Sequence, residues 1–247
     1  FWLTLVIKMP ASAAIVVAAS ILGERSGPVV GAMIATLPIS AGPNYAYLAL
    51  EHGPLFVHQS ALASLPANAA TGVFILAYVA LAHRGSLAQS LGGALAAWAV
   101  AIFLVSRFTW SVPAAIALNA MVYGSGILAT RRFIRHQRAT AAGRRAWDLP
   151  TRAFAVMALV AIVLVAGRII GPKAAGFAAL APVVLTSLAL ILHNRIGGPA
   201  TASVMPHGLP GMLGSTAAIV VLCLGVIPFG SAVALTGALM VSIGWNA

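Results

Sequence analysis

The chain has 247 residues, of which 61% are hydrophobic and only 7% are charged, whereas a typical globular chain carries about 25% charged residues. So few charges cannot cover a water-facing surface, which excludes an ordinary soluble domain. The net charge of +11 does not indicate nucleic-acid binding, because nine of the fourteen Lys and Arg residues lie between Arg131 and Lys173, largely in one loop.

Apolar runs follow one another along the whole chain, each about as long as the 20 residues that a helix needs to cross a bilayer core. Lipid offers the backbone no hydrogen-bond partner, and the alternating pattern of a membrane barrel is absent from the sequence, so the spans are expected to be helical. The sequence therefore predicts an all-α, polytopic transmembrane helical bundle of nine spans, with ten as the alternative. The predicted spans cover residues 1–22, 28–50, 55–82, 88–106, 112–130, 152–170, 174–193, 200–227 and 229–246.

A basic segment divides the predicted spans into two groups. It runs from Arg131 to Arg152, and its basic residues far outnumber Asp148. Lys and Arg accumulate in cytoplasmic loops. We therefore expect a first transmembrane half at 1–130, a basic cytoplasmic loop at 131–151 and a second transmembrane half at 152–247. The expected location is a bacterial inner membrane.

The chain also matches itself when it is shifted by 144 positions. The identical pairs are Gly23 with Gly167, Gly27 with Gly171, Pro28 with Pro172, Ala35 with Ala179 and Pro38 with Pro182. Further pairs, the last two after one added residue, are Lys8 with Arg152, Gly53 with Gly197, Pro54 with Pro199 and Thr71 with Thr216. Chance similarity between Ala- and Gly-rich spans is one explanation. A duplication is the other, and because the copies are five spans apart, it would be an inverted-topology repeat of the kind that secondary transporters use.

Interrupted segments occupy corresponding positions in the two halves, which is the sequence signature of a transporter site. Proline removes an amide donor and clashes with the preceding turn, so a helix broken there exposes backbone groups that can bind a solute. The interruptions are Pro38, Gly42 and Pro43 against Pro182, and Pro66 against Pro206 and Pro210. The candidate substrate-binding residues near them are Ser40, Gly42, Asn44, Tyr45, Asn68, Thr71, Thr186, Ser187, His207, Ser215 and Thr216. The alternative is that these residues only kink the helices and hold them together.

Enzymatic chemistry finds no support in the sequence. The three acids, Glu24, Glu51 and Asp148, form no close pair for acid and base catalysis, and the six histidines lack metal-ligand spacing. We therefore expect no catalytic residue, no metal and no cofactor. Lys8 is expected either to snorkel toward the headgroups or to face a polar interior. Glu51 is expected in a loop, and Asn119 in a hydrogen bond between helices.

A family resemblance rests on the stretch GAMIATLPISAGPNYAYLALEHG, which follows an apolar first span and a short charged turn. It is similar to the second span of the GlpM-type family of small bacterial membrane proteins. The resemblance covers roughly residues 1–85 and, more faintly, 151–230. It rests on the placement of Gly and Pro, and it implies a membrane location and little chemistry.

Two functions fit this sequence. The first is a transporter or exporter of a small polar or anionic solute, which works by alternating access between two inverted repeats, with lipid and the solute as its partners and no nucleic acid. The alternative is a non-catalytic subunit that stabilises or recruits a larger membrane complex, for which the basic loop would be a docking or anionic-lipid surface. A homo-oligomer is compatible with both.

Overall fold

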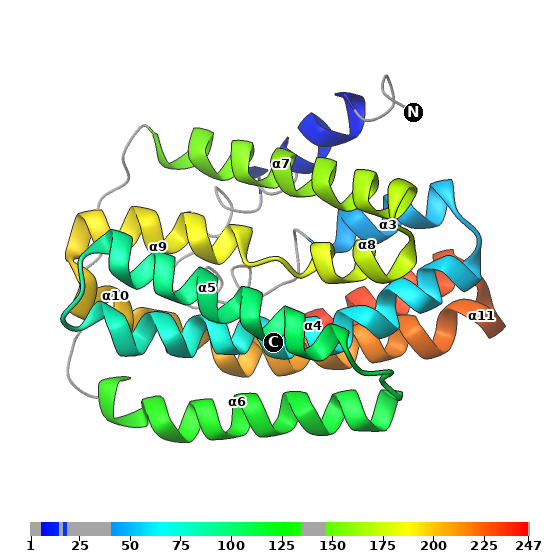
Figure 1. The fold of residues 1–247 in the computed structure, drawn as a ribbon. Coiled ribbons are helices and arrows are strands. Elements are labelled where there is room, and N and C mark those ends of the chain that lie inside the picture. The colour runs from blue at the N-terminus through cyan, green and yellow to red at the C-terminus, as the bar shows by residue number, and fades with distance from the viewer. Residues whose placement is uncertain (1–5, 15–16, 19–40, 135–146, 247) are drawn as a thin grey trace.

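The structure, a computed structural model, describes residues 6–14, 17–18, 41–134 and 147–246, and every regular element within these ranges is a helix (Figure 1). Residues 6–14 are helical. The elements after them are α3 (Ala41–Glu51), α4 (Pro54–Ala82), α5 (Leu87–Ser106), α6 (Val112–Ile134), α7 (Asp148–Ile169), α8 (Pro172–Ala179), α9 (Val183–Ile196), α10 (Gly198–Val204), the 3-10 turn η1 (Met205–Gly208) and α11 (Leu209–Asn246). For this part of the chain, the predicted all-α class is confirmed.

Five helical segments of the described chain are long and apolar enough to cross a membrane. They are Pro54–Ala82, Leu87–Ser106, Val112–Arg131, Pro172–Ile196 and Gly198–Asn246. A shorter apolar helix, Val156–Ile169, lies within α7. The molecule therefore has the helices of a multi-pass membrane protein, while the count of nine or ten spans stays a prediction.

The last of these segments is 49 residues long, more than twice the length that a bilayer core requires. It reverses direction at Gly230, whose φ of 79° and ψ of 165° are non-helical and strained for any residue with a side chain. Beyond the reversal, Trp245 Nε1 donates a hydrogen bond of 3.0 Å to the Pro210 carbonyl. A Cβ built on Gly237 would lie 3.4 Å from Val221. α11 is thus a hairpin of two antiparallel arms, which agrees with the predicted boundary between residues 227 and 229.

α4 is the central helix of the bundle. In its most apolar window 72% of the residues are buried, against 11% in α5. Figure 1 shows α7 along the top, α8 and α9 below it, α4, α5 and α11 in the middle, and α6 along the bottom. α5, α6, α8, α10 and α11 pack on α4. A polar side chain in the middle of α4 therefore faces other helices and not lipid.

The outer surface of the bundle is apolar. Large side chains such as Phe103, Met121 and Phe229 are 55%, 66% and 68% exposed. An apolar surface that extends over α5, α6 and α11 far exceeds the patches that soluble monomers expose. Contact with lipid tails explains this surface, because an apolar side chain that faces lipid avoids the free-energy cost of exposure to water.

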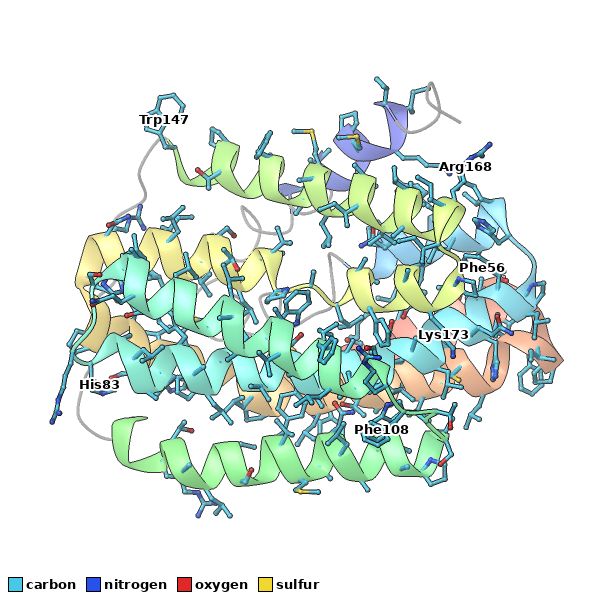
Figure 2. The ribbon with its side chains drawn as sticks, in the orientation of Figure 1. Phe56, His83, Phe108, Trp147, Arg168 and Lys173 are labelled. Carbon is cyan, nitrogen blue, oxygen red and sulfur yellow. The ribbon has the colours of Figure 1, made fainter. Side chains whose placement is uncertain are left out.

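The helices run roughly along one axis, and the loops gather at two ends (Figure 1). Figure 2 places His83 and Trp147 at one end, and Phe56, Phe108 and Arg168 at the other. α4 and α7 therefore run in opposite senses between these ends. The loop after α4, which carries Arg84, lies at the end where α7 begins.

Two of the expected helix interruptions are placed differently by the structure. α4 continues through Pro66, and Gly42 and Pro43 lie in the first turn of α3, where proline is tolerated because the first amides of a helix have no partner within it. Glu51 was expected in a loop, but it is the last residue of α3. The interruptions within the second half lie at residues 180–182, between α8 and α9, and at η1. Pro38 lies outside the described residues.

Candidate substrate site

Asn68 is the centre of a buried polar cluster where α4, α6 and α11 meet. Its Nδ2 donates hydrogen bonds of 3.1 Å to Asn119 Oδ1, 3.2 Å to the Met212 carbonyl and 3.0 Å to Thr216 Oγ1. Its backbone carbonyl accepts a hydrogen bond of 2.5 Å from the Tyr123 hydroxyl. The side chains of Asn68 and Asn119 are fully buried. Because nothing in lipid can replace these hydrogen bonds, the cluster fixes how the three helices pack.

The hydrogen bonds also fix the orientation of both amides. Asn119 Nδ2 donates to the Leu65 and Ala115 carbonyls, both at 2.8 Å, so its Oδ1 is the atom that faces Asn68. Asn68 must then present its own Nδ2 to Asn119 and to the Met212 carbonyl. Its Oδ1 is consequently turned elsewhere. This atom is buried and has no hydrogen-bond partner.

Thr71, one turn further along α4, contacts the interruption between α8 and α9. Its Oγ1 donates a hydrogen bond of 2.9 Å to the Leu180 carbonyl. At that point the helix has stopped, since Leu180 has φ −103° and ψ 12°, and Pro182 supplies no amide hydrogen. The broken helix of the second half therefore lies against the middle of α4, close to the polar cluster of Asn68.

A second polar chain links α3, α4 and α8. The Tyr45 hydroxyl is hydrogen-bonded to Ser64 Oγ, and Ser64 Oγ donates to the Gly176 carbonyl at 2.7 Å. α8 approaches α4 so closely here that a Cβ on Gly176 would lie 2.2 Å from the Ser60 carbonyl oxygen. Ser60, Ser64, Asn68 and Thr71 form a polar stripe along α4, and all four are buried.

The remaining candidate residues lie in several places. Asn44 is fully buried in α3, while Gly42 is exposed in the first turn of that helix. Ser187 is buried and donates to the Val184 carbonyl of its own helix. Ser215 is buried in α11 next to Thr216, which bonds both Asn119 and the Met212 carbonyl.

Three candidates lie apart from the cluster or beyond the described chain. Thr186 Oγ1 is buried without a hydrogen-bond partner on α9, one turn beyond Pro182. His207 is exposed in η1, with its Nδ1 3.2 Å from the Val204 carbonyl. Ser40 lies outside the described residues. The structure thus places Asn68, Thr71 and Thr216 around the middle of α4, and it places Tyr45 at Ser64, one turn before Asn68 on the same helix.

Several residues of the site were not selected from the sequence. Asn119 was expected to bond between helices, and this prediction is confirmed. Ser64 and Tyr123 were not identified, although small and polar residues recur at positions 60, 64, 68 and 71 of one helix, a spacing that places them along one face. That periodicity was the signal that could have found Ser64.

Lys8 forms an ion pair. Its Nζ lies 2.6 Å from Glu51 Oε1, and the two side chains are 9% and 22% exposed. The ammonium group also lies 5.0 Å from the centre of the Tyr47 ring, within reach of a cation–π interaction. The ion pair therefore ties the helix at residues 6–14 to the end of α3.

No protein family, curated protein sequence or solved structure matches the chain. The resemblance to GlpM-type proteins therefore stays a prediction. Among the described residues, no three His, Cys, Asp or Glu side chains lie close enough together to hold a metal ion.

Proposed function

We propose that the protein is a secondary transporter of a small polar or anionic solute, which binds midway across the membrane where two inverted repeats cross. The observation that carries this proposal is the contact between α4 and residues 199–227, the segment that the repeat pairs with α4. Asn68 is the middle residue of α4 (Pro54–Ala82). It bonds the Met212 carbonyl, one residue from the position that the repeat pairs with Asn68 itself.

The two segments pack antiparallel along their length. His58 Nδ1 lies 2.7 Å from the Cys223 carbonyl at one end. At the other end, a Cβ on Gly198 would lie 2.2 Å from the Ala82 carbonyl oxygen. A pair of equivalent helices that cross antiparallel at their midpoints is what a two-fold axis in the membrane plane produces, and inverted-repeat transporters bind their solutes near such an axis.

The starts of the paired helices support the same reading. α4 begins at Pro54 after Gly53, and α10 begins at Gly198 and Pro199 after Gly197. α5 and the second arm of α11 occupy the next paired positions, and each runs antiparallel to the helix before it. α6 lies between the two proposed copies and has no equivalent helix in the second copy. This extra span makes the number of spans between equivalent helices odd, so the second copy has the opposite orientation in the membrane.

The proposed orientation places the end with His83 and Trp147 in the cytoplasm of a bacterial cell, because α6 ends and α7 begins there and the basic segment 131–151 connects them in the sequence. The opposite end, with Phe56 and Phe108, then faces outward (Figure 2). Lipid and the solute are the proposed partners. The protein itself is proposed to carry no catalytic group.

Cysteine accessibility tests alternating access without knowledge of the solute. In a Cys223→Ala background, Thr71→Cys places a thiol on the buried stripe of α4, and Ala94→Cys places one at a buried apolar position of α5 as the matched control. In sealed vesicles of each orientation, a small charged thiol reagent is added from one side at a time. A transporter exposes Thr71→Cys to both sides in turn, while Ala94→Cys stays unreactive.

A helper subunit gives a different result. Its polar stripe would serve only to hold helices together, so Thr71→Cys would be as unreactive as Ala94→Cys from both sides. That outcome, accompanied by other membrane proteins that co-purify with the chain, would replace the transporter with a subunit of a larger complex.

A further inference from the structure

The unpartnered Asn68 Oδ1 restricts the kind of solute that can bind. It belongs to a side chain with no exposed surface, at the midpoint of the central helix. Buried polar atoms are almost always hydrogen-bonded, so a buried acceptor without a donor calls for an explanation such as a missing water, ion or ligand. Here the amide is held in place by Asn119 and Met212, and it cannot turn its Oδ1 toward them without losing both bonds.

The donor groups of Asn68, Thr71 and Tyr123 are already used. Asn68 Nδ2 donates to three acceptors, and Thr71 Oγ1 donates to the Leu180 carbonyl. The Tyr123 hydroxyl donates to the Asn68 carbonyl. What the middle of α4 still offers is an oxygen acceptor, so the complementary group on a ligand is an N–H or O–H donor.

Fixed charge is absent from the parts of α4, α6 and α11 that meet at Asn68. The sequence has no Asp, Glu, Lys or Arg at residues 26–50, 59–83, 108–130, 174–194 or 196–247. These ranges include the central part of α4 and all of α10 and α11. A charged solute or a sodium ion would therefore have only backbone and side-chain dipoles to replace its water, with no opposite charge beside it, which makes its burial less favourable than that of a neutral solute.

We propose that Asn68 Oδ1 accepts a hydrogen bond from the transported solute, and that this solute is uncharged and carries an N–H or O–H donor. The inference rests on the proposed transport function and narrows it. The proposed function allows polar or anionic solutes, and the inference excludes the anionic ones. Amides, imides and nucleobases have the required chemistry.

Matched pairs of solutes test this. Acetamide and uracil carry N–H donors and no charge, whereas acetate and orotate are anions of similar size. We expect acetamide or uracil to raise the thermal midpoint of the purified wild-type protein, and we expect acetate and orotate to leave it unchanged. Asn68→Leu, which has nearly the same volume and no acceptor, should lose the stabilisation, while Ser125→Ala, on the exposed side of α6, should retain it.

Protection of a thiol gives a second measurement in case Asn68→Leu does not fold. Uracil at a concentration that stabilises the wild type should slow the labelling of Thr71→Cys at least several-fold, and orotate should not. Stabilisation or protection by orotate, by acetate or by sodium chloride in place of choline chloride would overturn the inference. If Thr71→Cys labels from both sides while no neutral solute protects it, the inference fails and transport stands; if Thr71→Cys never labels, both fail.

Discussion

Replacing Asn119 with leucine removes the most connected side chain of the polar cluster while it preserves volume. Asn119 takes part in three hydrogen bonds between helices, one to the Leu65 carbonyl and one each from Asn68 and Thr216. Its fourth bond, to the Ala115 carbonyl, stays within α6. Hydrogen bonds between membrane helices contribute about 0.6 kcal/mol each on average. Asn119→Leu should therefore lower the free energy of unfolding by about 2 kcal/mol.

Ser125→Ala is the matched control for this change. Ser125 is on the same helix and also loses a polar group, but its hydroxyl is exposed and bonds only the Met121 and Val122 carbonyls of α6. We expect this variant to change stability by less than about 0.5 kcal/mol. Both free energies are measured by unfolding in mixed micelles with increasing dodecyl sulfate. If Asn119→Leu is as stable as Ser125→Ala, the cluster does not hold α4, α6 and α11 together and the argument is wrong.

Four further predictions address the packing and orientation of the bundle. Gly176→Ala should destabilise the protein by about 1–3 kcal/mol in the same unfolding assay, since its new Cβ meets the backbone of α4; Gly124→Ala, in open space on α6, should be neutral or mildly stabilising. Gly230→Ala should lower the thermal midpoint, because its positive φ costs about 1–3 kcal/mol for a residue with a side chain, whereas Gly244→Ala should not, and equal midpoints would argue against the hairpin turn. Glu51→Gln and Lys8→Met should each destabilise, and the double variant should show a coupling energy of about 1–3 kcal/mol in a mutant cycle; additive effects would mean that the ion pair contributes nothing. In whole cells, a membrane-impermeant thiol reagent should label Ser111→Cys at the outer end and spare Ser86→Cys, with buried Cys223 silent as the internal control, and the reverse pattern would invert the proposed topology.

The sequence predicts several helices of the described chain because lipid imposes one simple rule on them. A run of apolar residues between charged or Gly- and Pro-containing segments must be a helix of bilayer length. The predicted run at 88–106 is found as Leu87–Ser106, and the predicted division at 227 and 229 falls at the Gly230 turn. These boundaries depend on local composition, which the sequence contains in full.

The positions of helix interruptions were predicted less accurately, since a proline breaks a helix only when nothing else supplies the missing contacts. Pro66 is accommodated within α4, which is enclosed by helices on nearly all sides. Pro182 does lie at a helix break, between α8 and α9, where the Leu180 carbonyl accepts a hydrogen bond from Thr71 Oγ1. That donor is 109 residues away along the chain. No local pattern could have identified it.

Long-range pairing also explains why Lys8 and Glu51 were interpreted separately. Each lies near the end of an apolar run, where a lone charge can reach the headgroups. Their contact joins positions 43 residues apart, and only the packing of the helix at residues 6–14 on α3 creates it. The candidate site also depends on long-range contacts. Asn68 and Thr71 were selected because they lie near Pro66, but their hydrogen-bond partners are on α6, on α11 and just after α8.

The hydrogen bonds of the polar cluster are weak enough to be exchanged in a conformational change. The bonds that Asn68 makes to Met212 and Thr216 are the ones that cross between the paired segments, so a rearrangement of the two repeats must exchange them. At about 0.6 kcal/mol per bond these two bonds amount to about 1.2 kcal/mol, which leaves the rearranged state populated at roughly 10%. A solute that gains one or two hydrogen bonds at Asn68 more in the rearranged state than in this one can shift an equilibrium of that size, whereas a fully charged network would hold it closed.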